Sequence, residues 1–167
     1  FSQLYDMKCA SQALTICQDI ICVSAIDGKV FTIQPDGSST TYTFPKSLSN
    51  TSALPATVWA QLSSTGTLYC FYDNKTLIAW DTLTKTPIKS VEGHDGSVWG
   101  LDVLQSSSSV PAATLVSCST DSTLKFWDLQ SGELLQSIYE PGSCIKCLST
   151  SENGRFLAVG DRQGNLR

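Results

Sequence analysis

The sequence predicts an all-β fold built from repeated four-stranded antiparallel sheets, and two observations carry this prediction. Residues 115–128 (LVSCSTDSTLKFWD) read as a strand, a tight turn at Asp121 and a second strand ending in Trp127-Asp128. A weaker copy (LYCFYDNKTLIAWD) occupies residues 68–81, with the turn aspartates 48 residues apart and the tryptophans 47 apart. A supersecondary unit that recurs at this interval is typical of β-propeller blades.

The third of four such units is the clearest. Apolar and polar residues alternate in each of its strand-like segments, as expected of half-buried strands: residues 97–103, 115–119, 124–129 and 134–138. Turn-forming residues stand at the joins, among them Asp121-Ser122 and Ser131-Gly132. We therefore expect four short antiparallel strands in this unit.

The other units follow the same order with more degenerate sequences. The second has segments at residues 56–62, 67–72, 76–81 and 87–91, with Asp73 in its turn and Trp80 near the end of its third segment. The first has segments at residues 13–17, 20–25 and 30–33, joined by the hairpin signal Asp27-Gly28. The fourth has residues 144–149 and 155–160 around a turn at residues 152–154.

We expect these units to be about three and a half blades of an incomplete propeller, for which seven blades is the expected total. The approximate blade boundaries are residues 9–44, 54–91, 93–138 and 143–167. Residues 35–56 and 105–114 are rich in Ser, Thr and Pro, and we interpret them as surface insertions. Because a closed propeller typically needs four to eight blades, the chain is expected to be a fragment.

Composition excludes several classes of function. The formal net charge is −4 and only 16% of the 167 residues are charged, so there is no basic stripe to neutralise nucleic-acid phosphates. No apolar run approaches the roughly 20 residues that span a bilayer, and no signal peptide is recognisable at the start. We expect an intracellular protein that binds neither nucleic acid nor membranes.

The seven cysteines are interpreted mostly as reduced core residues, because their number is odd and most lie in apolar segments. Cys144 and Cys147 form a C-x-x-C, which in other contexts indicates zinc or redox chemistry. Their spacing in an alternating segment puts them on opposite faces of a strand, and no second ligand pair completes a tetrahedral site. The core interpretation is therefore favoured over a metal or redox site.

Catalytic and cofactor-binding patterns are absent from the sequence. It contains no Gly-rich phosphate loop, no paired carboxylates and no cluster of metal ligands. We expect no enzyme activity, no catalytic, cofactor-binding or metal-binding residues, no cofactor and no small-molecule partner.

The third unit resembles a WD repeat, in the segments GHDGSVWGLDV and SCSTDSTLKFWDL. The resemblance implies a structural hydrogen-bonded set in which Asp121 contacts His94, His94 contacts the hydroxyl of Ser117, and that hydroxyl contacts the indole N–H of Trp127. A buried Trp needs such a partner, because an unsatisfied buried donor costs about 1–3 kcal/mol. A hydrolytic triad is the alternative, but Ser117 has no G-x-S-x-G elbow around it.

The second and fourth units are not expected to form this set. The second keeps Asp73 and Trp80, but Tyr69 takes the place of the serine and no Gly-His precedes it. In the fourth, Gln163 and Val159 replace the aspartate and the serine. We expect these units to depend on apolar packing between blades.

The order of the units is similar to that of the mitogen-activated protein kinase-binding protein 1 family, which includes a WD-repeat relative that works at spindle poles. The quoted motifs are CVSAIDGKVFTI, LYCFYDNKTLIAWD, SCSTD and NGRFLAVGDRQGNLR. The resemblance implies a non-enzymatic scaffold that binds proteins of MAP kinase (JNK) signalling or of the centrosome and spindle pole, and a cytoplasmic location. The alternatives are a WD-repeat subunit of a ubiquitin-ligase receptor or ribosome-biogenesis complex and, more remotely, a propeller hydrolase.

Overall fold

The structure is a computed structural model, and it describes most of the chain. The described residues are 11–17, 19–25, 27–48, 57–63, 66–73, 75–104, 114–129, 131–151 and 153–167. Side chains are described for these residues except at 11–13, 17 and 57–59.

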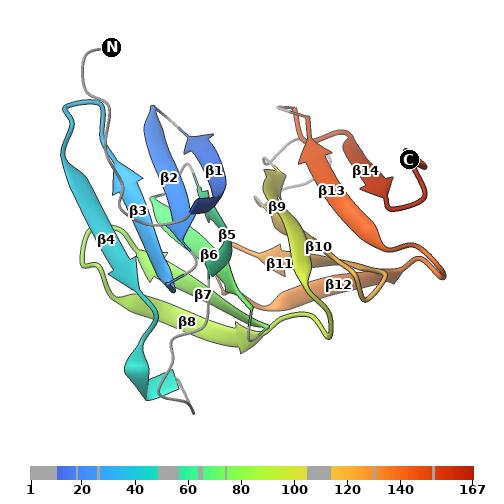
Figure 1. Ribbon diagram of the computed structural model, residues 1–167, viewed down its shortest axis with the longest axis horizontal. Helices are drawn as coiled ribbons and strands as arrows, with labels where there is room; N and C mark the ends of the chain where they lie inside the picture. Colours follow the sequence, from blue (N-terminus) through green and yellow to red (C-terminus); the bar gives the residue numbers. More distant parts are fainter. Residues whose placement is uncertain are drawn as a thin grey trace. The chain divides into compact units, whose positions relative to one another are not determined.

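The described elements are strands, apart from one short 3-10 helix, and the strands form antiparallel sheets in sequence order (Figure 1). The first sheet contains β1 (Ser11–Cys17), β2 (Ile20–Ala25), β3 (Lys29–Ile33) and β4 (Ser39–Thr43), followed by the 3-10 helix Lys46–Leu48. The second contains β5 (Thr57–Leu62), β6 (Thr67–Tyr72), β7 (Thr76–Asp81) and β8 (Pro87–Glu92).

The third sheet contains β9 (Val98–Leu104), β10 (Thr114–Ser119), β11 (Thr123–Asp128) and β12 (Leu134–Tyr139). The fourth pairs β13 (Ile145–Thr150) with β14 (Leu157–Asp161), and Gly160 also forms a bridge with Leu166. The bounds of the strands lie within two residues of the predicted segments, except that no segment was predicted for β4. That the sheets belong to a single partial propeller domain stays a prediction.

The chain divides into two compact units. The first consists of residues 1–74 and 78–88, and the second of residues 75–77 and 89–167. The first unit holds the sheet β1–β4 and most of β5–β8, whereas the second holds the sheets β9–β12 and β13–β14. No helix in the described part of the chain has the length and apolar character needed to cross a membrane.

The core of the first unit lies between its two sheets. Strand β3 shows the alternation that produces such a core, since every second residue is buried. The residues of this core come from both sheets, are largely apolar and are fully or nearly buried: Cys22, Val30, Tyr42, Phe44, Ala60, Leu62, Leu68, Cys70, Tyr72, Ile78 and Trp80. The core of this unit is therefore shared by consecutive sheets, as expected of stacked blades.

The core of the second unit is built in the same way. Strand β10 is buried along its whole length because it lies inside its sheet. Cys118, Leu124 and Ile145 form a buried cluster between the third and fourth sheets. Partly buried side chains surround it: Phe126, Ile138, Leu148, Leu157 and Val159.

One prediction about the first unit was wrong. Residues 35–56 were expected to be a surface insertion, but β4 lies within them and completes the first sheet. Two aromatic side chains cause this: Tyr42 packs edge-on against Trp80, with ring centroids 5.7 Å apart, and Phe44 packs against Tyr72 at 4.7 Å. The high Ser and Thr content masked the strand, because only these two aromatic residues mark its buried face. The other expected insertion, residues 105–114, lies outside the described residues except for Thr114.

Candidate functional site

The hairpin between β10 and β11 positions the carboxylate of Asp121. Ser122 adopts a left-handed conformation (φ 67°), which closes the tight turn. Asp121 Oδ1 accepts hydrogen bonds from the backbone N–H of Thr123 at 2.9 Å and from its hydroxyl at 2.6 Å. Asp121 Oδ2 accepts one from the backbone N–H of Asp95 at 2.8 Å. The carboxylate thus links the hairpin to the loop that precedes β9.

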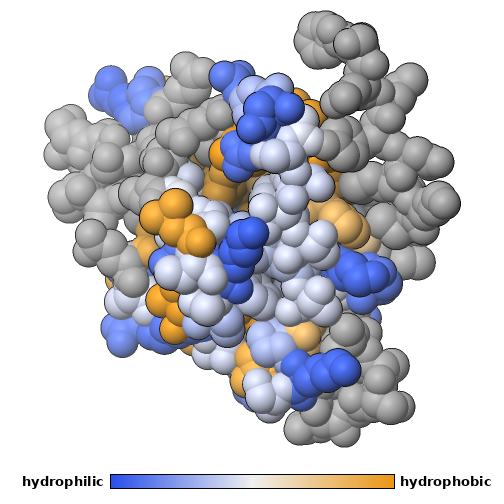
Figure 2. All heavy atoms as spheres, turned by 90° about the vertical axis from the view of Figure 1, so that its left-hand side faces the viewer, coloured by the Kyte–Doolittle hydropathy of each residue, from blue (hydrophilic) through white to orange (hydrophobic). Residues whose placement is uncertain are grey.

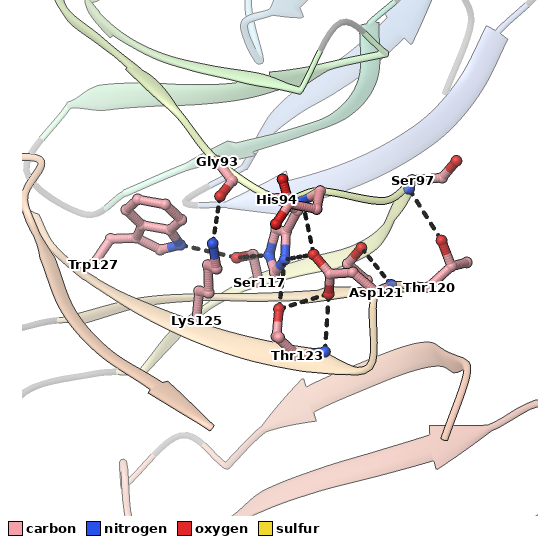
Figure 3. Close-up of polar contacts among 11 residues, drawn as sticks. Gly93, His94, Ser97, Ser117, Thr120, Asp121, Thr123, Lys125 and Trp127 are labelled. Carbon is pink, nitrogen blue, oxygen red and sulfur yellow. Dashed lines mark hydrogen bonds and ion pairs between the residues drawn. The ribbon is translucent and has the colours of Figure 1, made fainter. Parts of the chain in front are cut away.

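His94 lies in that loop and connects the carboxylate to the interior of the third sheet (Figure 3). Its Nδ1 lies 3.1 Å from Asp121 Oδ2 and 2.9 Å from the Thr123 hydroxyl, and its Nε2 lies 2.7 Å from Ser117 Oγ. Trp127 Nε1 donates to the same Ser117 Oγ at 2.9 Å. The structure therefore brings together His94, Ser117, Asp121 and Trp127, the four residues named from the sequence.

Proton positions follow from these contacts. The indole N–H of Trp127 can only donate, so Ser117 Oγ accepts it and directs its own hydrogen to His94 Nε2. Neutral His94 then carries its hydrogen on Nδ1 and donates it to Asp121. Each donor in the series from indole to carboxylate has an acceptor, so the buried polar atoms of the set are satisfied.

Further contacts fix the loop that carries His94. Lys125 Nζ donates to the carbonyl oxygen of Gly93 at 2.6 Å. On the other side, the Ser97 backbone N–H donates to the Thr120 hydroxyl at 3.1 Å, and the Thr120 N–H donates to the Ser97 carbonyl at 3.0 Å. The imidazole of His94 lies against the side chain of Trp127 with ring centroids 6.5 Å apart. The loop is thus tied to the sheet on both sides of the imidazole.

Sequence reasoning missed the contributions of Thr123, Thr120 and Lys125. A signal was available for Thr123, because an Asp followed two residues later by a Thr is a turn pattern in which the carboxylate accepts from the later residue. No comparable signal existed for Lys125. Its partner is the carbonyl oxygen of Gly93, and a long-range contact with the main chain leaves no mark on the pattern of side chains.

Burial determines the ionisation state of His94, whereas hydrogen bonds determine that of Asp121. Burial lowers the pKa of His94 to about 4, although the carboxylate of Asp121 opposes this shift. Burial acts to raise the pKa of Asp121, but hydrogen bonds from Thr123 and the proximity of His94 outweigh it, and that pKa falls to about 2. At neutral pH the set therefore contains a neutral imidazole and one carboxylate.

The Ser117–His94–Asp121 geometry resembles that of a hydrolytic triad, but its surroundings are unsuited to catalysis. Ser117 has no solvent-exposed surface and His94 is 2% exposed, so no substrate carbonyl can approach the hydroxyl. Ser117 Oγ also accepts the indole N–H of Trp127, which reduces its nucleophilicity. This sealed environment favours an architectural role, which stays a prediction.

The second sheet has a tryptophan at the equivalent place but no network around it. Strands β6 and β7 begin and end 47 residues before β10 and β11, so Trp80 corresponds to Trp127 and Cys70 corresponds to Ser117. Trp80 is 4% exposed, and none of the described residues accepts a hydrogen bond from its buried Nε1. This sheet thus retains the aromatic packing of the third without its polar partners.

The same comparison corrects the alignment made from the sequence. Matching Asp73 to Asp121 gave a spacing of 48 and placed Tyr69 opposite Ser117, one residue out of register with the strands. Asp73 is exposed in the turn after β6, and by the 47-residue spacing of the strands it corresponds to Thr120 and not to Asp121. The tryptophans give the correct spacing because they lie within paired strands, whereas the aspartates lie in turns.

The remaining predicted positions lie in turns of the first and fourth sheets. Gly28 adopts φ 77° in the β2–β3 hairpin, and the side chain of the preceding Asp27 accepts from the backbone N–H of Lys29 at 3.3 Å. In the fourth sheet, Gln163 Nε2 donates to the Gly142 carbonyl at 3.0 Å. Both turns have the left-handed residue that Ser122 supplies in the third sheet, without a buried histidine beside it in the described structure.

The cysteines fall into two groups. Cys22, Cys70 and Cys118 are buried, and burial raises the pKa of Cys118 to about 12. Cys144 is half-buried and Cys147 is exposed, so the expectation that both belong to the core was wrong. Cys147 lies on β13, which pairs only with β14 in the described structure. Cys9 and the side chain of Cys17 lie outside the described residues.

Among the residues that the structure describes, no group of three or more His, Cys, Asp or Glu side chains could hold a metal ion.

Comparisons with known proteins agree with this geometry. Residues 85–128 match the family described as "WD domain, G-beta repeat", so this segment is similar to a WD repeat. The WD repeat-containing protein pop1 of Schizosaccharomyces pombe is 35% identical over 82 residues, covering 49% of this chain and 10% of that protein. The human mitogen-activated protein kinase-binding protein 1 is 23% identical over 146 residues, covering 60% of this chain and 10% of that protein.

The solved structure of U3-55K has a TM-score of 0.77 at 16% identity, and the match covers 98% of this chain and 50% of that one. A likeness at this identity establishes the fold. The predicted fold class, an all-β WD-repeat β-propeller present in part, is confirmed. The chain spans only about a tenth of the length of the two relatives named above.

Proposed function

We propose that the protein is a non-enzymatic scaffold whose propeller blades bind segments of other proteins. The observation that supports this most strongly is the sealed Ser117–His94–Asp121 set: its reactive-looking groups are buried and face one another. A blade closed in this way leaves its exposed loops and strand edges as the surfaces available to partners. WD-repeat propellers present such surfaces as platforms for protein binding.

The assembly that we propose is one of MAP kinase (JNK) signalling or of the centrosome and spindle pole, with a cytoplasmic location. The order of the sequence motifs supports this, together with the 60% of the chain that aligns with the human mitogen-activated protein kinase-binding protein 1. We assign no kinase contact to a residue of this chain, because no basic-plus-apolar docking motif is recognisable in it.

The alternative is a WD-repeat subunit of another assembly, and one observation favours keeping it. A relative named as a pre-mRNA-splicing factor, cwf17 of Schizosaccharomyces pombe, is 29% identical over 100 residues and also covers 60% of this chain. Sequence similarity therefore does not by itself select the MAP kinase pathway. The specific alternatives are a ubiquitin-ligase receptor and a subunit of a ribosome-biogenesis complex.

Crosslinking in cells that express the tagged natural protein, followed by affinity purification and mass spectrometry, would test the proposal. Recovery of MAP kinase pathway or centrosomal proteins supports it, whereas cullin adaptors or nucleolar proteins would favour the alternative. The Trp127→Ala variant serves as the control, because partners that require the folded third sheet should be lost with it. Recovery of the same proteins by both forms would show that this propeller does not bind them.

A further inference from the structure

Strand β12 presents an unusually apolar free edge. It is the last strand of the third sheet and pairs only with β11 (Figure 1). Three of its six residues are large exposed hydrophobic side chains: Leu134 is 47% exposed, Leu135 57% and Tyr139 64%. The strand contains neither a charged residue nor a proline. Natural proteins usually protect such edges with one or the other.

Of the last strands of the other two four-stranded sheets, β8 is protected by charge and proline, whereas β4 has neither but exposes only Ser and Thr side chains. Strand β8 begins with Pro87, contains Lys89 and ends in Glu92. Strand β4 is composed of Ser and Thr around the buried Tyr42. Figure 2 views the molecule from the side on which β4 lies in Figure 1, and the coloured part of this surface shows pale, blue and orange areas next to one another. Among the last strands of the three four-stranded sheets, β12 is therefore the one that combines several large exposed hydrophobic side chains with the absence of charge and proline.

The pairing of β12 identifies the backbone groups that face away from the sheet. The Glu140 N–H donates to the Ser122 carbonyl, so residue 140 forms a hydrogen-bonded pair with β11, as do residues 138 and 136 by antiparallel alternation. The N–H and C=O groups of Ser137 and Tyr139 consequently point to the free edge. Within the described part of the chain, nothing pairs with them. An extended backbone is the ligand that matches this alternating row of donors and acceptors.

Acidic residues at the two ends of β12 indicate the charge that a bound segment would carry near its own ends. Glu133 directly precedes β12 and its side chain is 73% exposed, with Lys89 Nζ 3.9 Å away. Glu140 directly follows β12 and its side chain is 42% exposed, beside Arg167. Each carboxylate already forms a surface ion pair, and such pairs contribute little, so basic residues near the ends of a bound segment can contact the same carboxylates.

We propose that the free edge of β12 binds an extended segment of a partner protein, which adds to the third sheet as an extra strand. Apolar side chains of the segment cover Leu134, Leu135 and Tyr139, and Lys or Arg residues near its ends lie beside Glu133 and Glu140. This deepens the proposed function, on which it rests, by naming the surface and the class of segment.

The test uses two proline variants of the full chain. Ser137→Pro removes one edge-facing N–H without breaking a bond to β11, and proline is tolerated at such positions. Thr41→Pro is the matched control, because β4 pairs with β3 in the same register and residue 41 likewise faces the free edge. A double variant, Leu135→Lys with Tyr139→Lys, tests the same edge through charge. Thermal melts establish that each variant is folded.

The probe is a synthetic peptide in which threonine and valine alternate between terminal lysines, and a version with terminal glutamates is compared with it. The readouts are the dissociation constant and the amide hydrogen exchange of Ser137 and Tyr139. We expect slower exchange at both amides, at least about tenfold weaker binding by Ser137→Pro and by the lysine variant, unchanged binding by Thr41→Pro, and weaker binding of the glutamate peptide.

Unchanged binding by Ser137→Pro would overturn the edge site while leaving the scaffold function standing. Unchanged exchange at Ser137 and Tyr139 with millimolar peptide would also overturn it. If Ser137→Pro instead abolished self-association of the chain and peptide binding were absent, the occupant would be a second copy, and the proposal of a partner segment would be wrong.

Discussion

Trp127 stabilises the third sheet through both its size and its indole N–H. The side chain is 2% exposed, and its Nε1 donates to Ser117 at 2.9 Å. We predict that Trp127→Ala lowers the free energy of unfolding by roughly 3–5 kcal/mol, because a large buried side chain is replaced by a methyl group. Urea denaturation measures this, with the exposed Trp99 replaced by Ala as a control. A loss below about 1 kcal/mol would mean that Trp127 does not contribute core packing.

The neutral state of His94 makes stability depend on pH. The pKa of His94 is lowered from 6.5 to about 4 in the folded state, so between these values the unfolded chain binds a proton that the folded chain does not. By linkage, the stabilisation is fully present above pH 6.5 and is lost as the pH falls towards 4, by an amount on the order of 3 kcal/mol.

The measurement is the free energy of unfolding from pH 7.5 to 4 for the wild type and for His94→Gln. Since Gln does not titrate, the variant should be less stable at pH 7.5 but should lose less stability across this range. Parallel curves for the two proteins would show that His94 is not held neutral by the fold.

At this scale, the sequence predicted contacts where residue types strongly constrain one another. The contacts within the polar set could be predicted because four residues occur in a WD-like order: a single histidine, a strand serine, a turn aspartate and a tryptophan. The exposure of Cys147 was not predicted, because alternation within β13 distinguishes two faces but does not say which neighbours cover each face.

Neighbouring sheets are tied together by threonine hydroxyls in both units. In the second unit, the Thr150 hydroxyl on β13 lies within hydrogen-bonding distance of Asp102 Oδ2 (3.0 Å) and of the Val103 carbonyl oxygen (3.1 Å) on β9. In the first, the Thr15 hydroxyl on β1 donates to the Ala60 carbonyl on β5 at 2.9 Å. The first strands of consecutive sheets therefore share a polar link as well as an apolar core.

We predict that Thr150→Val destabilises the protein by about 1–2 kcal/mol, because the carbonyl and carboxylate oxygens lose a half-buried donor while side-chain volume is kept. Chemical denaturation measures the change. Thr43→Val on the exposed face of β4 is the matched control and should stay within about 0.5 kcal/mol of wild type. Equal effects of the two substitutions would show that the link between sheets contributes nothing beyond strand propensity.

Strands with apolar residues at most of their positions were predicted closely, whereas β4 was not. Strands β6 and β7 coincide with their predicted segments because Leu, Phe, Ile and Trp mark them throughout. Strand β4 depends on Tyr42 and on Phe44 just beyond it, and the contacts that order it come from the second sheet. Tertiary packing of this kind is not visible in a local window of sequence.

At the scale of the whole molecule, the acidic balance predicts which polyanions the chain avoids. With 15 acidic and 11 basic residues, its net charge of −4 opposes association with nucleic acid. We expect no shift of duplex DNA or single-stranded RNA at micromolar protein in about 150 mM salt, measured by gel electrophoresis or fluorescence anisotropy. Saturable binding that weakened steeply with salt would contradict this expectation.

The central claim is that the polar set of the third sheet serves the architecture of a WD-repeat blade. A double-mutant cycle on Ser117→Ala and Trp127→Phe tests it most directly, with unfolding free energies measured by urea denaturation. Because each side chain leaves a buried partner unsatisfied when the other is removed, we predict a coupling of about 1 kcal/mol or more between the two sites. Additive effects, with coupling below about 0.3 kcal/mol, would contradict the claim.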